Sequence, residues 1–173
     1  VGSEMCIRDR PNPAQAKGIG NSTTMPTDAL SIEDMKPVLL KLCESVCARL
    51  RKAHMYAGTI TVEIKYSNFH SCSHQIALPS PDYSSTVIYE TSLSLLQELW
   101  NGTPVRLLGV RATRLTDETA PIQLDLFSYQ EHTGQTEKNR KLDKTIDAIR
   151  RKYGEGAIMR GSLLSHTDTH SSN

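Results

Sequence analysis

The sequence predicts an α+β domain in which a four-stranded antiparallel sheet carries two helices on one face. Two segments repeat apolar residues every three or four positions, as helices do. Four others alternate apolar with polar residues or are rich in β-branched and hydroxyl side chains, as strands are. Their order is strand, helix, strand, strand, helix, strand. A chain with that order can form two layers, with both helices on one face of the sheet and the other face uncovered.

Size and composition fit one soluble domain of ordinary size. The chain has 173 residues, of which 38% are hydrophobic and 23% charged, and no apolar run approaches the length of a membrane span. The formal net charge of +1 is too small to indicate a nucleic-acid partner by itself. Among the four cysteines, Cys43 and Cys47 lie one helical turn apart between leucines, which indicates buried thiols. We therefore expect a reducing, cytoplasmic setting.

The first elements are predicted after an N-terminal segment that we exclude. Residues 1–10 read like a translated sequencing adapter, so we interpret 1–16 as artefact and linker, and we expect a chain truncated at its N-terminal side. The segment 17–25 is rich in Gly, Ser and Thr and is predicted as a strand. The segment 31–55 has one apolar face and is predicted as a helix. Pro37 is tolerated there if Asp34 is the N-cap, because the first turn needs no amide hydrogen.

The remaining elements follow the same reasoning. Residues 59–67 alternate strictly and predict a half-buried strand, and 68–81 return as its hairpin partner, ended by Pro79 and Pro81. Residues 84–102 begin with serines and stop at Asn-Gly, which predicts the second helix. Residues 104–115 are aliphatic with interspersed arginines and predict the last strand.

The uncovered face of this sheet is the predicted binding surface. Its side chains are mostly short, and Lys65 and Arg111 add positive charge, as contact with a phosphate backbone requires. No aromatic residue falls on this face, which favours duplex backbone over a stacked single strand. A merely solvated sheet face is the alternative, and Glu63 counts against DNA contact. The candidate DNA-binding residues are Lys17, Asn21, Ser22, Thr24, Lys65, Ser73, Arg106, Arg111 and Arg114.

A metal site is not expected. His70, Cys72 and His74 share one side of a predicted strand, but zinc usually takes four ligands from two separated pairs, and the chain offers no second pair. The sequence also has no phosphate-binding glycine loop and no catalytic triad motif. We therefore expect no catalytic residue and no cofactor in this chain. A small metalloenzyme using these three residues is the weakest of the function classes considered.

Four ordered motifs resemble one protein family. KGIGNSTTM, the ITVEIKYSNF hairpin, PVRLLGVRATRL and QLDLF together resemble the little-finger domain and tail of Y-family translesion DNA polymerases, in particular bacterial polymerase IV and its UmuC-like relatives. The resemblance covers residues 17–127. It implies a monomeric domain that grips the backbone of primer-template DNA during repair synthesis. It places catalysis, with two Mg²⁺ ions, in an upstream palm.

The same resemblance assigns the tail. QLDLF looks like the peptide that binds the bacterial sliding clamp, with Gln123, Leu124, Asp125, Leu126 and Phe127 as the contact residues. We place the DNA-binding domain at 17–116, a linker with this motif at 117–136, a helical segment at 137–164 and a disordered tail at 165–173. An apolar stripe in 137–153 comprises Leu142, Ile146, Ile149 and Tyr153. Two alternatives stay open: QLDLF packs on its own domain, or the chain is a protein-interaction module that binds no DNA.

Overall fold

The computed structural model describes residues 17–117 and 129–161. Its elements are β1 (Gly18–Ala29), α1 (Ile32–Lys52), β2 (Met55–Tyr66), β3 (Ser71–Asp82), α2 (Ser85–Leu99), β4 (Val105–Thr113), β5 (Thr116–Asp117), α3 (Tyr129–Tyr153) and a 3₁₀ turn (Glu155–Ala157). The predicted α+β class is confirmed. A fifth strand is present because the two residues of β5 pair with the start of β2. No helix in these two ranges is long and apolar enough to cross a membrane.

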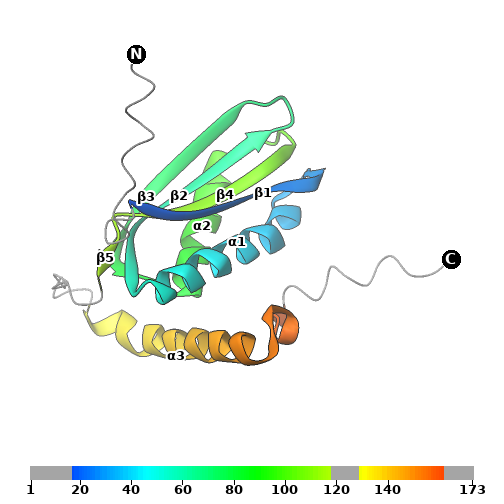
Figure 1. The fold of residues 1–173 in the computed structure, drawn as a ribbon. Coiled ribbons are helices and arrows are strands. Elements are labelled where there is room, and N and C mark those ends of the chain that lie inside the picture. Colours follow the sequence, from blue (N-terminus) through cyan, green and yellow to red (C-terminus); the bar gives the residue numbers. More distant parts are fainter. Residues whose placement is uncertain (1–16, 118–128, 162–173) are drawn as a thin grey trace, which may run out of the picture.

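The sheet has the strand order β1-β4-β2-β3, and every pairing is antiparallel. Figure 1 shows α1 and α2 on one side of it, with no described element over the other side. We call that uncovered side the open face. Because side chains alternate along a strand, Val110 and its neighbour Val62 on β2 point toward the helices, and Arg111 and Thr61 point to the open face.

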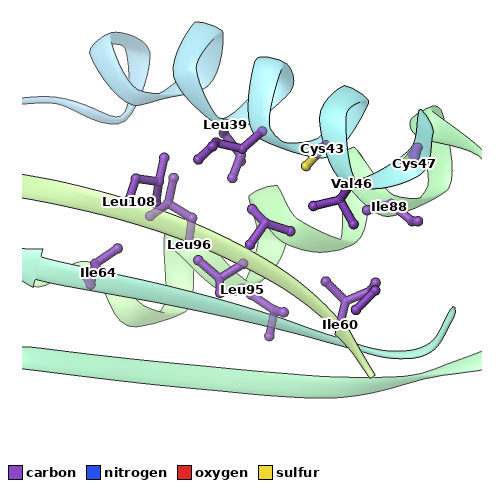
Figure 2. Packing of buried hydrophobic residues seen from close by; sticks show 14 of the residues in the cluster. Leu39, Cys43, Val46, Cys47, Ile60, Ile64, Ile88, Leu95, Leu96 and Leu108 are labelled. Atoms are coloured by element: carbon purple, nitrogen blue, oxygen red, sulfur yellow. The ribbon is translucent and has the colours of Figure 1, made fainter. Parts of the chain in front are cut away.

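The core lies between the sheet and the two helices (Figure 2). Its central side chains are Leu39, Val46, Ile60, Ile64, Ile88, Leu96 and Leu108. Each such side chain stabilises the fold by about 1.5–3 kcal/mol relative to an exposed position. Burial raises the pKa of the Cys43 thiol to about 12, so this cysteine stays protonated and unreactive at neutral pH.

The start of α1 differs from the expectation. Ser31, not Asp34, is the N-cap: its Oγ accepts a hydrogen bond from the Asp34 amide at 3.2 Å and donates to the Asp34 carboxylate at 2.7 Å. The Asp34 carboxylate also accepts a hydrogen bond from the Leu30 amide at 3.3 Å, so Ser31 and Asp34 together fix the start of the helix. Pro37 therefore lies inside the helix, where it leaves the Glu33 carbonyl without its intrahelical partner.

The edge strands end later than predicted, although β3 also begins later, at Ser71 rather than at residue 68. β3 continues through Pro79 and Pro81 to Asp82, and β1 continues past residue 25 to Ala29. Both strands have a neighbour on one side only, so a residue without an amide hydrogen can leave the ladder intact. The central strand β2 also begins earlier, at Met55 rather than at residue 59.

Helix α3 lies against the helix layer, on the side away from the sheet (Figure 1). It begins at Tyr129, within the segment predicted as linker. The apolar stripe faces solvent at its two ends, where Leu142 is 54% exposed and Tyr153 is 67% exposed, whereas Ile146 and Ile149 between them are partly buried. The hydrogen bonds of this helix to the domain come from its charged side chains.

The contact between α3 and the domain is a network of ion pairs. Arg51 of α1 donates two hydrogen bonds to Asp147, at 2.5 and 2.9 Å, and Glu44 accepts one from Arg150 at 2.9 Å. Asp143 accepts a hydrogen bond from the Ser85 amide at 2.9 Å and so caps the N-terminus of α2. We call these residues the α3 network, and Arg160 joins it by contacting both Glu44 and Asp143.

Candidate nucleic-acid interface

The open face brings together predicted side chains from all four main strands. Ser22 lies opposite Gly109, Thr24 opposite Leu107, and Ser73 opposite Glu63. Lys65 pairs with both Leu107 and Ser71. The predicted orientation is confirmed for these strands. Serine, threonine and glycine are frequent on this surface, so most of its side chains are short.

Arg111 lies against the glycines of the edge strand. A Cβ atom added to Gly20 would be 3.2 Å from Cγ of Arg111, and one added to Gly18 would be 3.3 Å from its Nε. A larger side chain at Gly20 would press on the arginine, and one at Gly18 would also meet the Ala112 carbonyl oxygen at 2.9 Å. The glycines thus leave room for Arg111 to lie along β1 with its guanidinium exposed. No carboxylate in the described part of the chain forms an ion pair with it.

A second positive cluster lies at the far end of this face. Tyr66 pairs with Val105 and Lys65 with Leu107, so Arg106 is the extra residue of a β-bulge. The bulge brings Arg106 to the same ring as Lys65: both cations lie over Phe69, at 5.2 and 5.3 Å from its centroid.

Sequence reasoning missed Phe69 as an exposed aromatic residue. It lies in the turn between β2 and β3 with a φ of +66°, and 63% of its surface is exposed. The expectation that the binding surface carries no aromatic ring is therefore wrong at its edge. The sequence position of Phe69 could have indicated this exposure, because a phenylalanine in a tight hairpin turn can make few contacts with the core.

Three predicted residues lie elsewhere. The structure corrects Asn21, which lies opposite Val110 on the helix side and donates a hydrogen bond to Oγ of Ser45 on α1 at 3.1 Å. Arg114 lies beyond the end of β4 with a φ of +49°, and its carbonyl accepts a hydrogen bond from the Gly58 amide. Lys17 is exposed directly before β1.

The acidic and metal-binding candidates have ordinary surroundings. Glu63 is exposed on the open face beside Gly109 and Ser73, and it is the negative charge that a bound polyanion would have to tolerate. Nδ1 of His74 lies 3.4 Å from the Glu98 carboxylate on α2. Within residues 17–117 and 129–161, no three His, Cys, Asp or Glu side chains gather as a metal site would require.

The predicted clamp-binding residues Gln123 to Phe127 and the predicted disordered tail at 165–173 lie outside the described residues. Their roles stay predictions.

Comparison with known proteins identifies similar sequences. Residues 16–126 match the model of the impB/mucB/samB family C-terminal domain. DNA polymerase IV of Clostridium acetobutylicum is 37% identical over 150 residues, which cover 87% of this chain and 37% of that protein. DNA polymerase IV of Alkaliphilus oremlandii is 34% identical over 158 residues, which cover 88% of this chain and 39% of that protein. The chain thus spans less than half the length of these relatives.

Solved structures share the fold. A complex of a beta-clamp processivity factor with the little finger domain of PolIV matches with a TM-score of 0.50 and 22% identity, over 63% of this chain and 97% of that one. A post-insertion binary complex of Dbh DNA polymerase matches with a TM-score of 0.51 and 20% identity, over 58% of this chain and 29% of that one. At these identities the likeness concerns the arrangement of helices and strands.

Proposed function

Since the chain belongs to the impB/mucB/samB family and carries the C-terminal domain of a Y-family DNA polymerase, we propose that this domain grips primer-template DNA through the open face of its sheet. The contact is to the sugar-phosphate backbone of the duplex and does not depend on base sequence. Backbone contacts position a protein on DNA, whereas base contacts give specificity. This role suits a polymerase, which must hold every sequence that it copies.

One observation carries this proposal: Arg111 lies over two glycines, exposed and without a carboxylate partner among the described residues. The strands beside it present serine, threonine and glycine, so a phosphate can come close to the sheet without meeting a long side chain. Lys65 and Arg106 supply two further cations at the far end of the same face. The open face therefore offers positive charge at both ends of a surface rich in hydroxyl groups.

Nucleotide transfer belongs to a different part of such a polymerase. The relatives named DNA polymerase IV extend well beyond the segment that this chain matches. We propose that a palm domain of the parent polymerase performs synthesis past lesions with Mg²⁺, and that the present domain contributes grip on the product duplex. A protein-interaction module that binds no DNA remains the second candidate, favoured by Glu63 on the open face.

We also propose that QLDLF ties the polymerase to its sliding clamp. The peptide places Leu126 and Phe127 within a polar stretch of sequence, where isolated apolar side chains gain stability only when something covers them. A solved structure of similar fold is a complex with a beta-clamp processivity factor, which supports this partner. A five-residue contact buries little area, so it acts mainly by keeping the polymerase at a high local concentration near DNA.

Replacing Arg111 with alanine is expected to weaken duplex binding by the same factor for every base sequence. Each phosphate contact releases about one counterion from the DNA when the complex forms. Without the Arg111 contact, the slope of log affinity against log salt therefore decreases in magnitude by about one unit. The measurement is fluorescence anisotropy with two unrelated duplexes over a range of salt concentrations. Lys36→Ala is the matched control, because Lys36 lies on the helix layer and pairs with Glu33. An unchanged slope in Arg111→Ala contradicts the proposal.

A further inference from the structure

The groove between α1 and α3 concentrates positive charge on the helix layer, away from the open face. Its volume is about 1280 Å³, and α1, α3 and the turn after α3 line it. Seven lysines and arginines line this groove against three acidic residues, in a chain whose formal net charge is only +1. Such a local excess of charge is typical of surfaces that receive an anionic partner.

The acidic residues of the groove are largely neutralised by the α3 network. Glu44 is held by Arg150 at 2.9 Å, and Asp147 is held by Arg51. Glu155, in the turn after α3, is the third acid. Five cations are exposed and have no ion-pair partner among the described residues: Lys41, Arg49, Lys52, Lys144 and Arg151. The groove therefore presents these five charges to solvent and suits a chain of phosphates.

The groove is connected to the open face at the edge of the sheet. Arg49, which lines the groove, donates a hydrogen bond from Nη1 to the carbonyl of Gly20 at 2.7 Å. Arg111 lies against the same glycine and belongs to the open face. β1 is an edge strand, so no other strand separates the two arginines at this position. Positive charge thus continues from one side of the domain to the other around β1.

We propose that the groove between α1 and α3 binds the phosphates of a single nucleic-acid strand that leaves the duplex held on the open face. The inference rests on the proposed function. A duplex has a persistence length of about 150 base pairs and cannot follow the turn around β1. An unpaired strand is flexible enough to do so. The continuity at Gly20 favours this ligand over an acidic peptide, because a separate peptide has no need of a connection to the open face.

The test compares a blunt duplex with the same duplex carrying an unpaired extension, on the 5′ end in one arm and on the 3′ end in another. The unmodified 173-residue chain is expected to bind one extended DNA about tenfold more tightly than the blunt duplex, with a steeper salt dependence. Combining Lys144→Ala with Arg151→Ala is expected to remove this gain and to lower the salt slope for the extended DNA by about 1.4 units, at about 0.7 per single-strand contact. Binding to the blunt duplex should stay within about twofold.

The matched control is the pair Lys138→Ala and Lys141→Ala, since both lysines are exposed on α3 and neither lines the groove. This pair should keep the gain from the extension. An equal loss of the gain in both pairs of variants would overturn the inference. The absence of any gain from the extension in the unmodified chain would also overturn it. So would polyglutamate that displaces the extended DNA as well as an unpaired strand does. Failure to bind the blunt duplex contradicts the proposed function instead. The groove is then tested with the unpaired strand alone, whose binding the Lys144 and Arg151 changes must weaken.

Discussion

Replacing Arg51 with methionine is expected to lower the free energy of unfolding by about 1–3 kcal/mol. The side chain of Arg51 is only 9% exposed and holds two carboxylates, Asp147 in a bidentate pair and Asp143 at 3.6 Å. Methionine keeps the aliphatic stem but leaves both carboxylates without this cation, and Asp143 is 3% exposed. Asp143 keeps Arg160 at 3.3 Å and the Ser85 amide, and Asp147 is 22% exposed, so the cost stays below that of an uncompensated buried charge. Urea denaturation followed by far-UV circular dichroism measures the change.

Lys41→Met provides the control for the Arg51 change. Lys41 lies on the same helix, is exposed and has no ion-pair partner among the described residues, so its replacement should alter stability by no more than about 0.5 kcal/mol. If Arg51→Met lowers the free energy of unfolding by no more than this control, the α3 network does not hold α3 against the domain. The apolar residues of α3 would then have to account for its position.

Replacing Leu126 and Phe127 together with alanine is expected to abolish capture by a sliding clamp. Both apolar side chains are proposed to enter a cleft on the clamp, and a contact this small has few other sources of affinity. The measurement is a pull-down with the beta clamp of Clostridium acetobutylicum, the source of a relative that is 37% identical. Full retention of clamp binding would remove QLDLF from the proposal.

A matched control separates the motif from a general loss of apolar surface. Leu142 and Tyr153 are a leucine and an aromatic residue that are exposed on α3, and their replacement with alanine should leave clamp capture intact. Thermal unfolding of the Leu126 and Phe127 variant tests the alternative that the peptide packs on its own domain. A fall in stability of about 2 kcal/mol or more would favour that alternative, because it is the cost of removing buried side chains.

The alternation of apolar residues was enough to predict the fold class and most of the open face. In β2, the residues Ile60, Val62 and Ile64 fix which side faces the helices, and the partner strands follow by pairing. In β1 the Gly, Ser and Thr residues provide no such alternation, so Asn21 was assigned to the wrong side. Strand ends were misplaced for another reason: proline stops a central strand but not an edge strand.

The position of α3 could not be predicted from local patterns. Its apolar stripe has helical spacing, which reveals a helix but not the face that it buries. The buried face is decided by partners far away in the sequence, since Arg51 and Asp147 are 96 residues apart and Glu44 and Arg150 are 106 apart. No short stretch of the sequence contains both members of such a pair. For the same reason the groove between α1 and α3 was not foreseen.

Lysine footprinting tests the central claim, that duplex DNA lies on the open face, most directly. Acetylation is followed by mass spectrometry with and without a blunt duplex at low salt. Lys65 lies on the open face and Lys36 on the helix layer. We predict that the duplex slows acetylation of Lys65 and leaves Lys36 unchanged. Equal protection of the two lysines, or protection of Lys36 alone, would contradict the claim.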